Sequence, residues 1–329
     1  MEIYTKENIK SQFYIETKSP AYRHALNNCE RVAMSKSNVL LIGESGTGKE
    51  VAAQYIHACS QRNTHPFIAV NCSSFTESLL ESELFGHEQG AFTGAVRSRT
   101  GKFELAQNGT LFIDEVGDIN LTTQVKLLRA IESKEIEKIG SNDRKQINFR
   151  LLTATNKDLS EEVRRNSFRE DFFYRISTIV IRIPPLRERK EDLEDMIWFF
   201  LKETQEENNI HIHDIDSTVW TFLMNYEYPG NIRELKNTID RMVVLSEDGV
   251  ITKEGIPLLY NLHKTNSDKS YDSSFDELLT WKEFKSNTEK NYLIRVLNET
   301  SGNVSEAAGI LGISTRQIFN KISEYNIPR

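Results

Sequence analysis

A glycine-rich segment could bind phosphate groups. It reads Gly-Glu-Ser-Gly-Thr-Gly-Lys from Gly43 to Lys49, matches GxxxxGK, and stands between an apolar run and a helix pattern. Its glycines would let backbone N–H groups turn toward phosphate oxygens, while the lysine and the helix N-terminus face the same anion. An ordinary glycine-rich turn lacks this combination of strand, spacing and helix. The segment therefore predicts an ATP site.

The residue after the lysine departs from the usual pattern. A serine or threonine there normally supplies a hydroxyl ligand for Mg²⁺, whereas this chain has Glu50. Because a carboxylate that pointed inward would repel phosphate, we expect Glu50 to point away. The Mg²⁺ ligand is then the Thr47 hydroxyl or a water molecule.

Two acidic residues end a second apolar run. Asp114 and Glu115 follow the apolar run 111–113, which is expected to be a strand. In an open α/β sheet, the carboxyl end of such a strand lies beside the phosphate loop. Asp114 suits the Mg²⁺ shell, directly or through water, and Glu115 suits polarising the attacking water. Alone, an Asp-Glu pair is usually a solvated turn. After a phosphate loop it predicts hydrolysis of ATP with Mg²⁺.

Alternating strands and helices would position these groups. The strand-like runs are 39–42, 67–70, 111–113, 151–154 and 179–183, and the helix patterns between them include 21–32, 50–58 and 121–131. This alternation predicts an α/β fold with a parallel sheet covered on both faces.

The rest of the chain is expected to be helical. From Glu188 to about Leu245 the sequence reads as helices only, a polar stretch after Tyr260 has no periodic signal, and the end is again helix-patterned. The expected division is a short extension (1–18), an α/β core (19–187), a helical appendage (188–260), a linker (261–274) and a small helical domain (275–329).

Composition limits the classes of partner. The 329 residues are 38% hydrophobic and 27% charged, as in ordinary soluble proteins. No apolar run approaches the roughly 18–20 residues of a membrane span, and the first ten residues are too polar for a secretory signal. We therefore expect a cytoplasmic protein, with the three cysteines as small buried thiols. A net charge of −7 means that DNA binding needs a local surface.

Six segments in a fixed order carry a family resemblance. They are GESGTGKE (43–50), ELFGHEQGAFTGA (83–95), GTLFIDEVGD (109–118), FREDFFYRI (168–176), PPLRER (184–189) and PGNIREL (229–235). Over about residues 19–250 they resemble the AAA+ domain of sigma-54-dependent transcriptional activators, the NtrC-like enhancer-binding proteins. GAFTGA is the most discriminating segment, because generic AAA+ ATPases lack it. The resemblance implies an AAA+ P-loop ATPase core, a helical lid and a small all-α helix-turn-helix domain.

The resemblance also implies roles for single residues. Asn71 matches the asparagine that pairs with Glu115 and couples it to nucleotide state. Arg169 and Arg175 match two arginines that reach a neighbouring subunit's γ-phosphate, so hydrolysis would need a homo-oligomer, from a dimer to a hexameric ring.

Thr155 and Asn156 match sensor I. The residues expected at the nucleotide are Gly43, Glu44, Ser45, Gly46, Thr47, Gly48, Lys49, Glu50, Thr155, Asn156 and Arg233, the last matching sensor II.

The GAFTGA loop is the expected contact with sigma-54. It comprises Gly90, Ala91, Phe92, Thr93, Gly94 and Ala95. From the residues alone, a glycine-flanked loop that exposes Phe92 to a partner and a hairpin tip with Phe92 tucked into the core are equal alternatives. The resemblance implies a loop that touches sigma-54 and moves with the state of the γ-phosphate.

The last helices resemble the Fis-type helix-turn-helix that ends these activators. They are predicted at 288–297, 305–311 and 315–325, with a tight turn and a serine N-cap at 311–314. Ile313, Ile318 and Ile322 would face inward. The side chains expected in a major groove are Ser314, Thr315, Arg316, Gln317, Asn320 and Lys321. The alternative is a plain three-helix dimerisation bundle.

The function that follows is ATP-dependent activation of transcription. The chain would bind double-stranded DNA at upstream sites and remodel the closed complex of sigma-54 RNA polymerase into an open complex. About 18 residues before the core are too few for a receiver domain. Control would then come from a separate protein or from the amount of this chain that is produced, unless this is a truncated piece. The alternatives are a DNA-binding repressor with a vestigial ATPase fold, and an AAA+ remodeler of another target.

Overall fold

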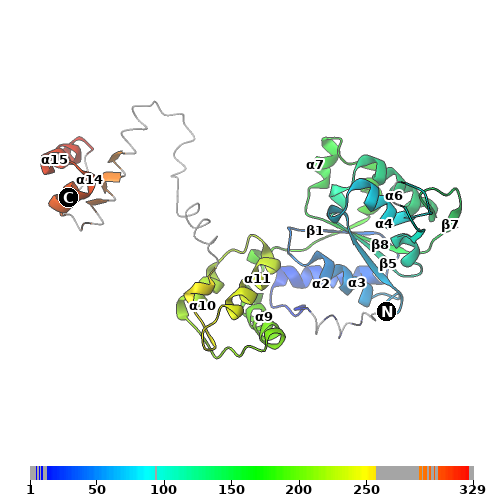
Figure 1. Cartoon of the computed structure of the whole chain (residues 1–329), viewed down its shortest axis with the longest axis horizontal. Coiled ribbons are helices and arrows are strands. Elements are labelled where there is room, and N and C mark those ends of the chain that lie inside the picture. Colours follow the sequence, from blue (N-terminus) through cyan, green and yellow to red (C-terminus); the bar gives the residue numbers. More distant parts are fainter. Residues whose placement is uncertain are drawn as a thin grey trace. The chain divides into compact units, whose positions relative to one another are not determined.

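The computed structural model divides the chain into two compact units, Met1–Pro257 and Leu258–Arg329 (Figure 1). It describes residues 5, 7, 9, 13–92, 95–256, 289–290, 292–294, 296–297, 300 and 303–325. The predicted linker, 261–274, lies outside the described residues. Each unit is considered by itself.

A five-stranded parallel sheet forms the centre of the larger unit, in the order β2-β5-β8-β1-β9 (Figure 1). Its strands are β1 (Val39–Ile42), β2 (Phe67–Asn71), β5 (Thr110–Asp114), β8 (Arg150–Thr155) and β9 (Ile179–Arg182). All five predicted strands are confirmed. The register places Asn71 beside Asp114 and Ile42 beside Thr155, so the expected site residues gather at one edge of the sheet.

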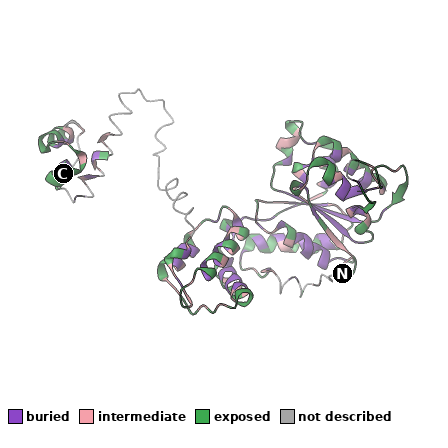
Figure 2. Cartoon of the chain, viewed as in Figure 1, coloured by how far each residue is buried: buried purple, intermediate pink, exposed green. Residues whose placement is uncertain are grey.

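Helices cover both faces of this sheet. They are α2 (Pro20–Ala33), α3 (Lys49–Ala58), α4 (Glu77–Phe85), α5 (Lys102–Leu105), α6 (Leu121–Ser133), α7 (Leu159–Arg164) and α8 (Glu170–Ile176). Alternate strand residues enter separate cores: Val39 and Leu41 pack with α2 and α3, while Leu40 packs with α4, α6 and α8. Figure 2 accordingly draws the strands mostly as buried residues.

Two short antiparallel hairpins interrupt this pattern. Strand β3 (Gly86–His87) pairs with β4 (Arg99–Thr100), and β6 (Glu135–Glu137) pairs with β7 (Arg144–Gln146). The sequence did not indicate them, because strands of two or three largely polar residues carry no apolar alternation. The GAFTGA loop lies between β3 and β4.

The lid follows the sheet. It contains α9 (Leu193–Asn208), α10 (Ser217–Asn225) and α11 (Asn231–Val244), together with β10 (Asp214–Ile215) and β11 (Val250–Ile251), which pair in parallel. The expectation that this region is purely helical was wrong at β10. Two-residue strands are again too short to leave a periodic signal.

The smaller unit contains a helix-turn-helix. Helix α14 (Val304–Leu311) ends at Gly312, whose φ of 65° is left-handed, and α15 (Thr315–Glu324) begins after the N-cap Ser314. The buried residues of this core include Leu293, Val296, Ala307, Ala308, Ile318 and Ile322, with Ile313 packed against them. The predicted inward-facing isoleucines and the serine cap are confirmed.

Candidate functional site

The phosphate loop joins β1 to α3. Gly46 and Gly48 have φ values of 77° and 93°, a region that favours glycine. A Cβ at Gly46 would lie 2.3 Å from the carbonyl oxygen of Gly230, and one at Gly43 would lie 2.8 Å from that of Ile183. The loop is therefore closely packed between the lid and the end of the sheet.

Lys49 places its ammonium group inside this loop. The side chain is 6% exposed, and its Nζ donates to the carbonyl oxygens of Gly43 at 2.9 Å and Glu44 at 3.1 Å. The same Nζ lies 3.9 Å from Glu115 Oε1. Burial lowers the pKa of Lys49, and the carboxylates of Glu115 and Asp114 oppose that shift. A cation held in this way is positioned to meet phosphate oxygens.

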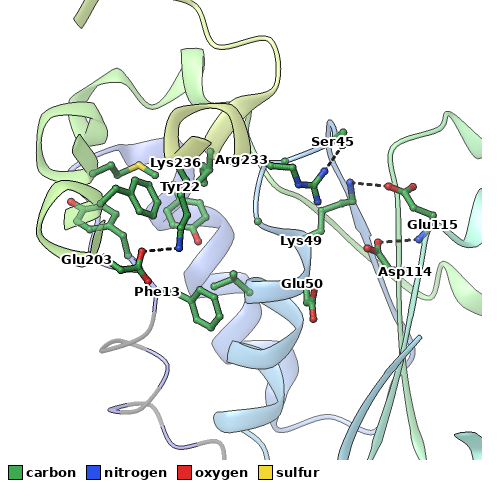
Figure 3. Close-up of a pocket in the computed structure, with 17 residues that line it drawn as sticks. Phe13, Tyr22, Ser45, Lys49, Glu50, Asp114, Glu115, Glu203, Arg233 and Lys236 are labelled. Carbon is green, nitrogen blue, oxygen red and sulfur yellow. Dashed lines mark hydrogen bonds and ion pairs between the residues drawn. The ribbon is translucent and has the colours of Figure 1, made fainter. Parts of the chain in front are cut away.

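Glu50 leaves the phosphate loop clear. Figure 3 shows its carboxylate directed away from the Nζ of Lys49, in agreement with the expectation. Burial, and then the charge of Asp114, raises the pKa of Glu50. The Thr47 side chain is buried, and its hydroxyl donates to the carbonyl oxygen of Glu44 at 2.9 Å.

The two acids lie at the end of β5. Glu115 adopts the left-handed conformation, with φ of 51°, where the chain enters the turn Val116–Asp118. Its Oε2 accepts the backbone N–H of Asn156 at 3.3 Å, and its pKa is raised by burial against the opposing effect of Lys49. Glu115 therefore bridges Lys49 and the end of β8.

Asn71 contacts the other acid. Its Nδ2 donates to Asp114 Oδ2 at 3.5 Å, and its Oδ1 accepts the N–H of Ser73. Within the described part of the chain, no hydrogen bond joins Asn71 to Glu115, contrary to the expected pairing. The sheet register sets Asn71 beside Asp114, while the left-handed backbone turns Glu115 toward β8.

The start of α11 holds the phosphate loop. The N–H of Ile232 donates to Gly46 O at 3.0 Å, and Arg233 Nη1 donates to Ser45 Oγ at 3.1 Å. Asn231, fully buried with φ of 55°, donates from Nδ2 to Ser45 O at 3.0 Å and Glu44 Oε2 at 3.2 Å. Arg233 was predicted here, whereas Asn231 was missed because a lone asparagine at a helix start carries no signal beyond capping.

A second missed contact reaches the same loop. Arg187 forms two hydrogen bonds with the Glu44 carboxylate, at 2.7 and 2.5 Å. Hydrogen bonds from Arg187, and then from Asn231, lower the pKa of Glu44 to about 2. Arg187 and Glu44 are so far apart in the sequence that local residue spacing could not predict their contact.

A cavity of about 320 Å³ opens beside the loop (Figure 3). Its size is that of a small-molecule site. It is lined by Phe13, Tyr14, Tyr22, Ser45, Gly46, Gly48, Lys49, Glu50, Val51, Asp114, Glu115, Met196, Phe200, Glu203, Ile232, Arg233 and Lys236. The phosphate-binding groups thus share one cavity with aromatic and aliphatic side chains from the segment before α2 and from the lid. Those apolar lining residues were not predicted.

A buried ion pair fixes the segment that contributes two of these aromatic side chains. Arg189 and Asp192 are both fully buried, 3.0 Å apart. Asp192 also accepts the Thr17 hydroxyl at 2.6 Å and the N–H groups of Lys18 and Ser19 at 2.6 and 3.2 Å. The chain just before α2 is therefore tied to the base of the lid.

The two residues predicted as sensor I lie on the other side of the loop. Thr155 and Asn156 line a second cavity, of about 500 Å³, together with Gly43 and Glu44. Asn156 does not line the first cavity, and its backbone N–H donates to Glu115, which does. The residues predicted at the nucleotide therefore lie on two sides of the phosphate loop, some lining the first cavity and some the second.

The two arginines at α8 differ in their contacts. Arg169 donates from Nε and Nη2 to the carboxylate of Asp171 at 3.0 and 2.7 Å. Arg175 is exposed, and within the described residues no hydrogen bond or ion pair engages its guanidinium. Neither arginine lines the cavity that contains Lys49.

The GAFTGA loop is folded back on its own ends. The N–H of Gly90 donates to Ala95 O at 2.9 Å, and that of Ala95 donates to Phe92 O at 3.0 Å. The Phe92 ring is 38% exposed and packs edge-on against His87, 5.0 Å between centroids. Phe92 is thus partly exposed rather than tucked into the core. Thr93 and Gly94 lie outside the described residues.

Some predicted DNA contacts are occupied within their own domain. Ser314 and Gln317 form a capping box at the start of α15, and Lys321 Nζ lies 2.6 Å from Glu289 Oε2. Thr315, Arg316 and Asn320 are exposed on the same helix.

Within the described residues, no helix is both long and apolar enough to cross a membrane.

Comparisons with known proteins agree with this arrangement. Residues 15–182 match the family described as "Sigma-54 interaction domain", residues 187–273 match "AAA+ ATPase lid domain", and residues 286–325 match "Bacterial regulatory protein, Fis family".

Named relatives align along almost the whole chain. The transcriptional regulatory protein ZraR of Salmonella typhimurium is 42% identical over 313 residues, which cover 95% of this chain and 69% of ZraR. The regulatory protein AtoC of Escherichia coli is also 42% identical, over 95% of this chain and 68% of its own. The Nif-specific regulatory protein of Azotobacter vinelandii is 41% identical, over 94% and 58% respectively.

Solved structures include NtrX from Brucella abortus, with a TM-score of 0.70 and 29% identity over 98% of this chain and 71% of that chain. NtrX has also been solved in complex with ADP and with ATP. The motifs, the fold and these matches lead to one assignment: the chain belongs to the sigma-54-dependent transcriptional activators, AAA+ ATPases that carry a sigma-54 interaction domain and a Fis-type helix-turn-helix.

Proposed function

We propose that this chain hydrolyses ATP at the cavity beside the phosphate loop and uses the energy to convert the closed complex of sigma-54 RNA polymerase into an open complex. The observation that carries the proposal is the position of Glu115, held between Lys49 and the backbone of Asn156. A carboxylate fixed beside the lysine of a phosphate loop can align and polarise a water molecule for attack on the γ-phosphate.

The residues at the nucleotide would divide the work. Lys49 neutralises the β- and γ-phosphates, the N–H groups of the loop bind phosphate oxygens, and Arg233 reaches the phosphates from the lid. The aromatic and aliphatic side chains of the cavity, including Phe13 and Phe200, suit the adenine base. Thr155 and Asn156 would sense the γ-phosphate from the other side of the loop.

Asp114 suits a bound Mg²⁺ ion. Among the described residues, no cluster of three or more His, Cys, Asp or Glu could hold a metal alone. That arrangement fits Mg²⁺, which proteins commonly bind through one or two carboxylates together with substrate phosphates and water. Mg²⁺ would neutralise phosphate charge. Asn71 would keep the Asp114 carboxylate oriented.

Hydrolysis would require a neighbouring subunit. Arg175 is exposed and lies outside the cavity of its own chain, so its guanidinium suits the γ-phosphate of an adjacent copy in a ring, up to a hexamer. Arg169 would join it on release from Asp171. An arginine supplied in trans stabilises transition-state charge and makes hydrolysis depend on assembly.

The GAFTGA loop would transmit the nucleotide state to sigma-54. Asn71, beside Asp114, caps the turn Cys72–Ser74, from which the chain continues through α4 to His87 and Phe92. Loss of the γ-phosphate would shift this path and the loop at its end. Gly90, Ala91, Phe92, Thr93, Gly94 and Ala95 form the proposed contact.

The C-terminal unit would bind double-stranded DNA at upstream sites, with α15 in the major groove. Ser314, Thr315, Arg316, Gln317, Asn320 and Lys321 are the proposed contacts. We also propose the domain limits 1–18, 19–187, 188–260, 261–274 and 275–329, a cytoplasmic location, and control by a separate protein.

Reconstitution tests the proposal. Purified full-length chain, ATP, sigma-54 polymerase and a promoter with an upstream binding site should yield a heparin-resistant open complex, which non-hydrolysable ATP analogues do not support. A repressor with a vestigial ATPase fold would bind the DNA without ATP turnover. A remodeler of another target would hydrolyse ATP and leave the promoter closed.

A further inference from the structure

An ion pair joins two lid helices at the wall of the nucleotide cavity. Lys236 Nζ, on α11, lies 2.9 Å from Glu203 Oε2, on α9, and both side chains line the cavity. Figure 3 shows the pair apart from Lys49, toward the part of the cavity where Tyr22 and Phe13 are drawn. A nucleotide whose phosphates meet Lys49 would therefore extend its base toward this pair.

Helix periodicity places the pair beside the apolar wall of the cavity. Met196, Phe200 and Glu203 are spaced by four and three residues, so they share one face of α9, and all three line the cavity. Lys236 follows Arg233 by three residues on α11, and its Nζ lies 5.9 Å from the centre of the Phe200 ring. Helix α11 thus contributes one cation beside the phosphate loop and a second beside the apolar wall.

The pair keeps hydrogen-bonding capacity for a ligand. A carboxylate accepts hydrogen bonds on both oxygens, and an ammonium group donates three. Within the described residues, the contact between Lys236 and Glu203 is the only hydrogen bond that either side chain makes. Glu203 Oε1 and two donors of Lys236 therefore remain, on side chains that are 30% and 38% exposed.

Adenine and guanine differ at the base edge that such a pair can read. Adenine carries a donor amino group at C6 beside the acceptor N1, whereas guanine carries the acceptor O6 beside a donor N1–H. A carboxylate next to an ammonium group offers an acceptor beside a donor. This arrangement complements adenine and sets like against like at both positions of guanine, which is how a polar site rejects a similar ligand.

We propose that Glu203 accepts a hydrogen bond from the 6-amino group of the base and that Lys236 donates to N1, so that the pair selects ATP over GTP. The inference rests on the proposed ATPase function of this cavity. The aromatic wall offers stacking area to any purine, so it does not distinguish the two bases. The ion pair supplies that discrimination.

Nucleoside diphosphates test the contact without hydrolysis. Titration calorimetry of the full-length protein with Mg²⁺ would give dissociation constants for ADP, for GDP and for purine riboside 5′-diphosphate, which lacks the amino group. One hydrogen bond to a charged group at a partly exposed site corresponds to about tenfold in affinity. We expect purine riboside diphosphate to bind about tenfold more weakly than ADP, and GDP to bind more weakly still.

Variants of the pair assign this preference to its two side chains. Glu203→Gln keeps the shape of the side chain, but its amide can turn to donate or to accept, so most of the preference for ADP over GDP should disappear. Exchange of the two charges, by Glu203→Lys together with Lys236→Glu, should reverse the preference. Glu206→Gln is the matched control, because Glu206 forms an exposed ion pair with Lys202 on the same helix and does not line the cavity. It should keep the wild-type preference.

The remaining outcomes separate this inference from the proposed function. The inference is overturned if the wild type binds ADP and purine riboside diphosphate equally, or if Glu203→Gln keeps the full preference for ADP. It is also overturned if Glu203→Gln weakens ADP and GDP equally, because the pair would then contact the sugar or the phosphates. In each of these cases ADP still binds, and the proposed ATPase function stands. If the wild type binds none of the three nucleotides, that function falls as well.

Discussion

The carboxylate of Glu44, in the phosphate loop, is held by both terminal nitrogens of Arg187, at 2.5 and 2.7 Å. Because Asn231 reaches the same carboxylate and the neighbouring Ser45 carbonyl, the loop and the lid share one polar junction. Lid position and loop geometry are thereby coupled through Glu44.

Loss of Arg187 should weaken ATP binding. We expect Arg187→Ala to raise the Kd for ATP several-fold, because the loop loses its attachment to the residues before the lid. Arg144→Ala is the matched control: Arg144 donates to the Glu137 carboxylate at 2.8 Å within the β6–β7 hairpin and lines neither cavity beside the loop. Equal effects of the two substitutions on ATP affinity would argue against the junction.

The ion pair between Glu44 and Arg187 should add little to the free energy of unfolding. Its contribution should be lost at acidic pH. The folded chain lowers the pKa of Glu44 to about 2, while an unfolded glutamate titrates near 4.3. The contribution is therefore complete above about pH 5 and disappears as the pH falls toward 2. Both side chains are more than 40% exposed, so solvent screening keeps it small. Denaturant titrations of wild type and Arg187→Ala at pH 7 and pH 3 would measure the difference.

Binding and hydrolysis should separate at Lys49 and Glu115. Lys49→Ala should abolish ATP binding, whereas Glu115→Gln should bind ATP and lose turnover, since an amide cannot polarise water as a carboxylate does. Burial raises the pKa of Glu115. The acidic limb of the pH–rate profile should therefore lie at a higher pH than for an ordinary glutamate. Normal turnover by Glu115→Gln would remove this residue from the water-positioning role.

Arg175 should act on a neighbouring subunit. Arg175→Ala should bind ATP yet hydrolyse it about 10³-fold more slowly at any protein concentration, while wild-type specific activity rises with concentration. Mixing Arg175→Ala with Lys49→Ala should restore partial turnover, because the second chain lends its arginine to the first. Arg164→Ala, on a surface ion pair, serves as control. A mixture that stays inactive, with rings still formed, would show that the arginine acts within its own chain.

Removal of the smaller unit should separate DNA binding from hydrolysis. A chain without residues 262–329 retains the whole sheet, the cavity and the lid, so its ATPase activity should remain within a few-fold of the full-length value. Sequence-specific DNA binding should disappear in an electrophoretic mobility assay. Retained binding to the same site would place the DNA-reading surface elsewhere.

The strands and the phosphate site could be read from the sequence because their signals are local. The run Val39–Ile42 ends where predicted, and the glycines that follow it have the backbone conformations that their pattern requires. Asp114 and Glu115 were found for the same reason: an apolar strand delivers two acids at its end. These features need only a few adjacent residues.

The remaining parts of the site depend on contacts between distant positions. Arg187 and Asn231 reach Glu44 only after the lid has folded, and Phe13 lines the cavity through a segment tied to Asp192. The left-handed backbone of Glu115, whose carboxylate accepts the N–H of Asn156, also leaves no trace in residue spacing. Tertiary packing determines these contacts, and residue spacing along the sequence does not reveal how the distant segments pack.

The GAFTGA loop should separate ATP hydrolysis from promoter opening. Phe92 is not among the described residues that line the nucleotide cavity, and we assign Thr93 no phosphate contact, so substitution of either residue should leave turnover within a few-fold. A ligand shifts a conformational equilibrium only through contacts that differ between the two states. Loss of the sigma-54 contact would therefore disconnect the nucleotide cycle from the polymerase.

The most direct measurement is open-complex formation by Thr93→Ala and Phe92→Ala at a sigma-54 promoter, with ATP turnover recorded in the same reaction. Met34→Ala, a substitution of an exposed apolar residue at the C-terminal end of α2, is the control and should open the promoter normally. We predict that both loop variants hydrolyse ATP, fail to open the promoter, and fail to be captured on sigma-54 with a transition-state analogue of hydrolysis. Normal promoter opening by both variants would contradict the proposal that this loop couples ATP hydrolysis to transcription.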